Sequence, residues 1–306
     1  MNIVSFPGLG IDRITLNPKI EITESFSIRW YAVIIVLGIL AAYVVCSRLL
    51  KSFGIKENDL LDCILYGIPI GFIGARLTYV LGDLESFDSF MDVISVWNGG
   101  LAIYGGIIFA AITIIVVCKI KKCSFGSMLD IFAIGLLIGQ MIGRWGNFVN
   151  VEVYGVATSL PWAMHINGSE TGVHPLFMYE ILWNLVGFIL IFGYRKLRKF
   201  DGEIFLWYLA WYGLGRGLME PMRNPEFNLR LFGVRIMMVL AFAMCIASVA
   251  TVIVFRVKKL GKLTGPITEE TQPLEENYDR QFEEAFEPDE DEVADEETEE
   301  ENDEDN

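Results

Sequence analysis

Residues 128–155 read MLDIFAIGLLIGQMIGRWGNFVNVEVYG, and the first 20 of them decide how the chain must fold. At 1.5 Å per residue, a helix over 128–147 spans about 30 Å, the thickness of the hydrocarbon core of a bilayer. Arg144 lies near the end of this mostly apolar run. A guanidinium inside a membrane is costly and normally faces a cavity or an ion partner, although Gln140, four residues earlier, could simply solvate it. The stretch therefore predicts a membrane-spanning helix that carries a functional arginine.

The composition of the whole chain also indicates a membrane protein. The chain has 306 residues, of which 53% are hydrophobic, and a mean hydropathy of +0.43. This is too apolar for an ordinary soluble domain. The N-terminus lacks the features of a cleaved signal peptide, so we expect the first apolar segment to stay as a membrane anchor. The cysteines lack CxxC spacing and His neighbours, which predicts free thiols and no metal site.

Charge divides the chain into two parts. Residues 266–306 contain 21 Asp and Glu and a single Arg, a net charge of −20, so residues 1–265 carry +5 of the total of −15. A long run of like charges with few apolar residues cannot bury enough surface to offset its ordering entropy. We therefore predict a transmembrane domain over 1–262 and a disordered acidic tail over 263–306. Docking of this tail to a basic partner is an alternative.

Seven apolar segments are long enough to cross a bilayer. They cover approximately residues 27–50, 61–81, 100–118, 128–147, 175–194, 202–220 and 231–257. The predicted fold class is all-α: a polytopic membrane protein with a seven-helix transmembrane bundle.

The charge of the loops predicts how this bundle is oriented, because Lys and Arg accumulate on the cytoplasmic side. The loops after segments one, three, five and seven are rich in Lys and Arg. The loops after segments two and four, GDLESFDSFMD and VEVYGVATSLPWAMHINGSETGV, have none. The alternation predicts an extracytoplasmic N-terminus and a cytoplasmic C-terminus. Arg223 and Arg230, after the sixth segment, are the exceptions.

In this orientation, polar residues that are unusual for membrane helices converge on the outer half of the bilayer. These residues are Tyr31, Arg76, Tyr79, Tyr104, Gln140, Arg144, Asn147, His174, Tyr179, Glu180, Tyr212, Arg216 and Glu220. Simpler explanations exist for some of them. Arg216 and Glu220 are four residues apart and could neutralise each other, and single tyrosines at helix ends are often interfacial anchors. The joint convergence nevertheless favours a binding site. Outward-facing guanidinium groups suit an anionic headgroup, because Arg pairs with phosphate in a bidentate manner.

Several motifs resemble the prolipoprotein diacylglyceryl transferase family. The stretch GRWGNFVNVEVYG at 143–155 is similar to the family signature G-R-x-G-N-F-x-N-x-E-x-x-G and supplies Arg144, Asn147, Asn150, Glu152 and Gly155. The similarity continues in family order through RWYAVIIVLG, GARLTYVL, WNGGLAIYGG, HPLFMYE and YGLGRGLMEPMR, to about residue 258. Only the acidic tail lies outside it.

The resemblance implies a multi-pass enzyme of the bacterial cell membrane whose active site faces the outer leaflet. Such an enzyme transfers the diacylglyceryl group of phosphatidylglycerol to the thiol of the lipobox cysteine in a prolipoprotein signal peptide, and releases glycerol phosphate. This is the first step of bacterial lipoprotein maturation, and it implies no metal, no soluble cofactor and no nucleic-acid partner. By motif, Arg144 and Arg216 hold the lipid phosphate, and Tyr104 and Glu152 are further catalytic candidates. The implied substrate-binding residues are Tyr31, Arg76, Asn147, Asn150, Gly155, His174, Tyr212 and Glu220.

Tyr104 is a departure from the family, many members of which have His in the stretch read here as GGLAIYGG. A tyrosine has an ordinary pKa near 10, against about 6.5 for His, so a phenolate base at neutral pH requires roughly 4 kcal/mol of stabilisation. We therefore expect Tyr104 to donate a hydrogen bond or to position a substrate, and the substrate thiol to lose its proton to Glu152, His174 or water.

Two other classes of function stay open on the sequence alone. A lipid flippase or transporter could use the arginines as a translocation path, although the polar residues cluster near one face and no inverted pair of interrupted helices is visible. A structural membrane subunit could use the ion pairs only to specify helix packing.

Overall fold

The computed structural model describes residues 1–23, 26–84, 87, 89–96, 99–224, 230–231 and 234–266. Within this range, Met1–Gly265 form one compact unit. The predicted disordered tail lies, apart from residues 263–266, outside the described residues, and so does the side chain of Arg230. All five cysteines carry free thiols.

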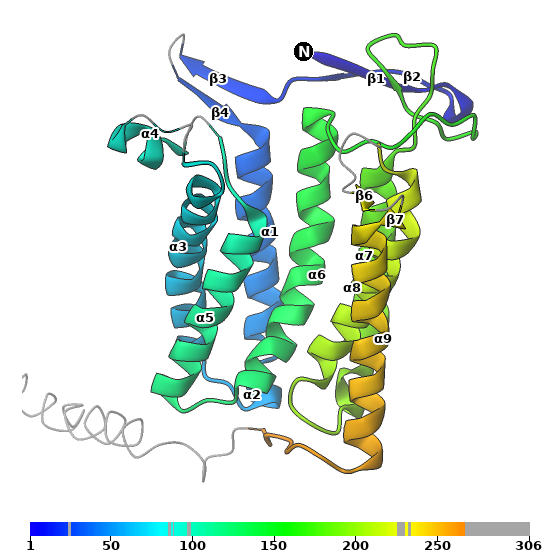
Figure 1. Ribbon diagram of the computed structural model, residues 1–306. Coiled ribbons are helices and arrows are strands. Elements are labelled where there is room, and N and C mark those ends of the chain that lie inside the picture. The colour runs from blue at the N-terminus through cyan, green and yellow to red at the C-terminus, as the bar shows by residue number, and fades with distance from the viewer. Residues whose placement is uncertain are drawn as a thin grey trace, which may run out of the picture. The chain divides into compact units, whose positions relative to one another are not determined.

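Long helices make up most of the compact unit (Figure 1). They are α1 (Trp30–Ser47), α3 (Glu57–Gly82), α5 (Ile103–Lys121), α6 (Phe125–Asn150), α7 (Leu176–Tyr194), α8 (Glu203–Met219) and α9 (Ile236–Val257). Among the described residues, six helices are long and apolar enough to cross a membrane. The helix α8, on the predicted segment 202–220, is not among these six because it has only 17 residues. The chain is therefore mostly helical, with six candidate membrane spans.

The central helix of the bundle is α6. It packs against α1 on one side and against α7 and α8 on the other, as Figure 1 shows. Ser124 caps its first turn by accepting a hydrogen bond from the backbone N–H of Ser127 at 3.2 Å. Met128, Ile131 and Ile134 recur every three residues along α6 and are fully buried. This apolar face places α6 in the core, so the polar residues near its other end lie between helices.

The N-terminal residues form strands, so the prediction of an all-α chain needs correction. β1 (Asn2–Phe6) pairs antiparallel with β2 (Ile11–Leu16) and with β5 (His165–Ile166), and β3 (Lys19–Thr23) pairs with β4 (Phe26–Arg29). A search for long apolar runs misses such strands because each has six residues or fewer. Figure 1 shows β1 to β4 at one end of the helices, which we call the strand end.

Short elements complete the connections between the long helices. They are the helices α2 (Leu50–Phe53) and α4 (Phe90–Ile94), the 3₁₀ turns η1 (Pro7–Leu9), η4 (Arg195–Leu197) and η5 (Glu220–Met222), and the hairpin strands β6 (Arg230–Leu231) and β7 (Val234–Arg235). The turn η5 follows α8 directly, at the strand end of the bundle.

A buried ion pair ties the helices together at the end opposite the strands. Asp130 of α6 is 0% exposed, and its Oδ2 accepts hydrogen bonds from Arg198 Nη1 at 3.2 Å and from the Gly202 N–H at 3.0 Å. Its Oδ1 accepts from the Phe205 N–H at 2.9 Å. Arg198 also donates to the carbonyl oxygen of Ser52 at 3.1 Å. Asp130 therefore fixes the connection between α7 and α8 against the start of α6.

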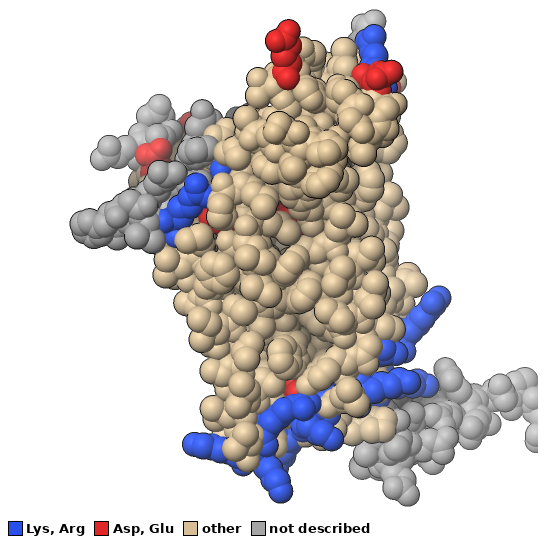
Figure 2. Space-filling model, turned by 90° about the vertical axis from the view of Figure 1, so that its right-hand side faces the viewer, with Lys and Arg blue, Asp and Glu red and all other residues tan. Residues whose placement is uncertain are grey.

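Charge is distributed unevenly over the compact unit. On the face drawn in Figure 2, Lys and Arg gather at the lower end, opposite the strands, while the band above them consists mostly of uncharged residues. An uncharged band between charged ends is the surface expected of a protein that is surrounded by lipid.

Candidate active site

A small cavity lies among α6, α7, α8 and the residue that follows η5, in the half of the bundle nearer the strand end. Its volume is about 70 Å³. Its lining residues are Gln140, Arg144, Glu180, Trp183, Asn184, Tyr212, Gly215, Arg216, Met219 and Arg223. Three predicted site residues, Arg144, Tyr212 and Arg216, thus line one cavity although they are up to 72 positions apart in the sequence.

Arg144 is the first member of a chain of polar contacts along the end of α6. Its Nε contacts the buried carboxylate of Glu180 on α7, and its Nη1 donates to Asn147 Oδ1 at 3.1 Å. Asn147 Nδ2 in turn donates to Glu152 Oε1 at 2.8 Å, and Asn150 Nδ2 donates to the same oxygen at 3.4 Å. The structure therefore connects four residues of the 143–155 signature to one another and to a carboxylate of the next helix.

The chain turns sharply after α6, and this turn positions Glu152. Val151 adopts a left-handed backbone conformation with φ 53°, which ends the helix. Further along, the Gly155 N–H donates to the His174 carbonyl oxygen at 2.9 Å. A Cβ on Gly155 would lie 2.5 Å from the Met222 carbonyl oxygen and 2.7 Å from His174 Cβ. Glycine is therefore required here so that three separate segments can approach one another.

Arg216 forms the second ion pair of the site. Its Nη2 lies 2.8 Å from Glu220 Oε2, and Glu220, only 1% exposed, also accepts a hydrogen bond at its carbonyl oxygen from Arg235 Nη1 at 2.8 Å. Gln140 donates to the Tyr208 hydroxyl at 2.8 Å. Arg216 Nη1 and Gln140 Oε1 are buried and have no hydrogen-bond partner among the described residues. An unpaired buried polar atom costs about 1–3 kcal/mol, so both atoms are available to a bound ligand.

His174 lies just before α7, where its ring contacts the ring of Tyr179 edge to face. Its Nδ1 is 3.2 Å from the Tyr179 hydroxyl, which also accepts a hydrogen bond from Trp162 Nε1 at 2.7 Å. Burial lowers the pKa of His174, because the charged imidazolium loses hydration. Burial therefore favours the neutral ring, which can accept a proton.

Three predicted site residues contact other parts of the molecule. The Tyr31 ring packs against Gly146 of α6, where a Cβ would come within 2.6 Å of it. Arg76 is buried and donates to four backbone carbonyl oxygens within residues 92–100, at 2.6 to 2.9 Å. Tyr104 is 61% exposed, and its hydroxyl lies 3.4 Å from a methionine sulfur of α9.

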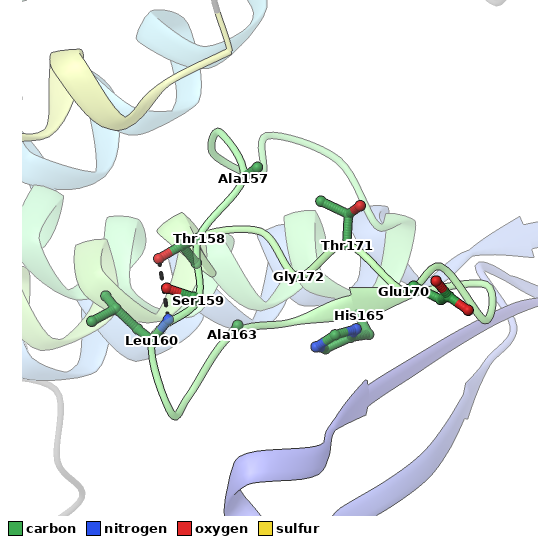
Figure 3. Close-up of a pocket in the computed structure, with 9 residues that line it drawn as sticks. All are labelled: Ala157, Thr158, Ser159, Leu160, Ala163, His165, Glu170, Thr171 and Gly172. Carbon is green, nitrogen blue, oxygen red and sulfur yellow. Dashed lines mark hydrogen bonds between the residues drawn. The ribbon is translucent and has the colours of Figure 1, made fainter.

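A separate, open cleft lies in the long connection between α6 and α7 (Figure 3). It is lined by Ala157, Thr158, Ser159, Leu160, Ala163, His165, Glu170, Thr171 and Gly172. His165 Nδ1 lies 3.0 Å from the carbonyl oxygen of Ser169. The predicted site residues are all described, and none of them lines this cleft, which is therefore not the candidate active site.

Sequence reasoning missed several residues of the cavity. Glu180 was one of the converging polar residues but was not assigned to the site. Trp183 and Asn184 follow it by three and four positions, so the helical period places them on the same face of α7. One feature of the sequence could have pointed to Arg223: it is an exception to the alternation of loops with and without Lys and Arg.

Comparison with known proteins places the chain in one family. The sequence model of the prolipoprotein diacylglyceryl transferase family matches residues 19–254 of this chain. A protein of Finegoldia magna named phosphatidylglycerol–prolipoprotein diacylglyceryl transferase is 41% identical over 224 residues, which cover 72% of this chain and 89% of the relative. A protein of the same name from Lactobacillus delbrueckii subsp. bulgaricus is 39% identical over 261 residues, covering 80% and 93%. A third, from Lysinibacillus sphaericus, is 41% identical over 227 residues, covering 70% and 83%. The chain, with the family signature at its arginine-lined cavity, belongs to the prolipoprotein diacylglyceryl transferase family.

Proposed function

We propose that the protein transfers the diacylglyceryl group of phosphatidylglycerol to the thiol of the lipobox cysteine of prolipoproteins. The observation that carries this proposal is the cavity among α6, α7 and α8, which both Arg144 and Arg216 line and where Arg216 Nη1 is buried without a hydrogen-bond partner among the described residues. Guanidinium groups bind phosphate oxygens through charge-assisted hydrogen bonds, so a phospholipid headgroup fits the chemistry of this cavity.

The proposed reaction develops negative charge on the phosphate. The cysteine sulfur attacks the glyceryl carbon that carries the phosphate ester, a carbon–sulfur bond forms, and the carbon–oxygen bond breaks. The electron pair of that bond stays on the phosphate oxygen, the thiol proton passes to a base, and glycerol phosphate leaves. Arg144 and Arg216 are held in place by Glu180 and Glu220, so they can stabilise this charge without reorganising.

The proton acceptor in this proposal is Glu152, His174 or water. Glu152 Oε1 is held by the amides of Asn147 and Asn150, and the neutral ring of His174 can accept a proton. We further propose that Tyr31, Asn147, Asn150, Gly155, Tyr212 and Glu220 shape the site around the arginines. Arg76 would act by holding the backbone at residues 92–93 and 99–100.

We expect the Tyr104→Phe variant to retain most of the transferase activity of the wild type. The hydroxyl makes one contact among the described residues, to Met237 Sδ at 3.4 Å, and the side chain is largely exposed. The test is the initial rate of lipid transfer by purified protein. A complete loss of turnover in a folded variant that still binds lipid would show that the hydroxyl takes part in the reaction.

The orientation in the membrane is part of the same proposal. We propose a seven-helix bundle in the bacterial cell membrane, with α8 as the seventh span, the N-terminus outside and the C-terminus in the cytoplasm. The gathering of Lys and Arg at the end opposite the strands supports this orientation (Figure 2). The arginine cavity, nearer the strand end, would then face the outer leaflet. Residues 263–306 would form a disordered cytoplasmic tail, as their composition indicates.

Reconstitution tests the proposed reaction against the flippase alternative. The purified protein is placed in vesicles containing phosphatidylglycerol labelled in its acyl chains, together with a lipobox peptide. Label that becomes attached to the peptide cysteine as a thioether supports the transferase. Movement of label between leaflets without covalent transfer would support a flippase. If the label is neither transferred nor moved, a structural role would be supported.

A further inference from the structure

We infer that Arg223 is a third phosphate-binding residue of the cavity, and that its guanidinium neutralises the negative charge of the bound phosphate. The inference rests on the proposed transferase function. Arg223 lines the same cavity as Arg144 and Arg216 but, unlike them, has no carboxylate within 4.0 Å among the described residues. Its guanidinium is therefore the cation of the cavity that has no counter-ion.

The charges around the cavity leave one positive charge uncompensated. Three guanidinium groups, from Arg144, Arg216 and Arg223, meet two carboxylates, from Glu180 and Glu220. Further out, Arg235, which donates to Glu220, and Glu152, which is connected to Arg144 through Asn147, add one charge of each sign and cancel. A phosphodiester carries one negative charge, whereas a phosphomonoester at neutral pH carries −1.5 to −2. The uncompensated positive charge of the cavity therefore equals the one negative charge of the lipid phosphodiester, and Arg223 is the residue that supplies it.

The environment of Arg223 favours an anionic partner. Burial and the nearby charges of Arg216 and Arg144 lower the pKa of its guanidinium, although Glu180 and Glu220 oppose this effect. Arginine stays charged in proteins even so, so the positive charge remains in a partly desolvated site. Such a charge gains stability from an anion that enters the cavity.

Backbone hydrogen bonds hold the main chain around Arg223 in place, and so fix the position from which its side chain extends. The Arg223 N–H donates to the Glu220 carbonyl oxygen at 3.2 Å, and the Val156 N–H donates to the Met222 carbonyl oxygen at 2.8 Å. Gly155 and Arg223 form an antiparallel bridge. The close approach that requires glycine at position 155 therefore also positions Arg223. Arg223 lies outside the 143–155 signature, but its position depends on Gly155, a residue of that signature.

Product inhibition by two soluble probes tests the inference. In the labelled-lipid assay, sn-glycerol phosphate carries the second negative charge and glycerophosphoglycerol, a phosphodiester, does not. We expect Arg223→Gln to raise the inhibition constants of both probes by roughly 10- to 100-fold, because a hydrogen bond to a charged group is lost in each case. Arg223→Lys should restore part of the lost affinity, since lysine keeps the charge but not the planar fork.

The controls separate this inference from the function on which it rests. Arg13→Gln makes the same change at an exposed position of β2 and should leave both inhibition constants unchanged. If the wild type transfers no label to the peptide, the proposed function itself is refuted. If the wild type transfers label and Arg223→Gln leaves either inhibition constant unchanged, then the role of Arg223 in binding phosphate is refuted.

Discussion

Replacing Arg144 with Gln is expected to lower transferase turnover by at least about 100- to 1,000-fold, the loss typical of removing one preorganised donor from a developing anion. Arg144 lines the cavity, and its contacts with Glu180 and Asn147 fix the direction of its guanidinium. A glutamine keeps the polar character of the side chain but removes the charge and the bidentate fork. The measurement is the rate of label transfer from phosphatidylglycerol to a lipobox peptide.

A second substitution separates lost chemistry from lost stability. Arg144→Gln alone leaves the buried Glu180 carboxylate without its cation, and this by itself destabilises the fold. The double variant Arg144→Gln, Glu180→Gln removes both charges, so we expect it to regain thermal stability while remaining inactive. Wild-type turnover in the folded single variant would contradict the role of Arg144, and so would recovery of activity in the double variant.

The Asp130→Ala substitution is expected to lower the free energy of unfolding by about 3–5 kcal/mol, because it removes the nearer carboxylate of the buried Arg198 guanidinium and leaves only Asp201, at 3.7 Å. Asp130 and Arg198 are both buried, and Asp130 also accepts two backbone hydrogen bonds at the start of α8. Thermal or denaturant-induced unfolding in detergent measures the loss. The substitution lies at the end of the bundle opposite the strands, so it should reduce stability without altering the affinity of the folded protein for lipid.

An exposed ion pair provides the matched control for Asp130. Asp62 Oδ2 lies 2.7 Å from Lys121 Nζ, and both side chains are partly exposed to solvent. Asp62→Ala should therefore cost at most about 1 kcal/mol, the usual limit for surface pairs. The double variant Asp130→Leu, Arg198→Met should recover much of the lost stability, because an apolar pair has no charge to desolvate. Equal losses for Asp62→Ala and Asp130→Ala would show that burial does not determine the effect.

The long helices could be predicted because their signal is local. A run of about 20 apolar residues is recognisable without knowing what it contacts. Predicted and observed positions differ by a few residues, as at α1, which begins at Trp30 because residues 26–29 pair with β3 instead. The strands could not be found in this way. Val4 and Phe6 are buried against Met164 and Phe177, and that contact depends on residues about 160 positions away.

The sequence by itself determined the helical segments, the charge of the loops and the family signature around Arg144. These properties depend on residue type and on spacing over a few turns. The helical period also indicated the pair of Arg216 with Glu220, four residues apart. Only the tertiary structure decided which distant groups meet: Glu180 pairs with Arg144, and Arg223 is left without a counter-ion among the described residues. The physical reason is that ion pairing requires contact within about 4 Å. Contacts between α6 and α7, or between the signature turn and η5, are set by helix packing and by the close approach at Gly155.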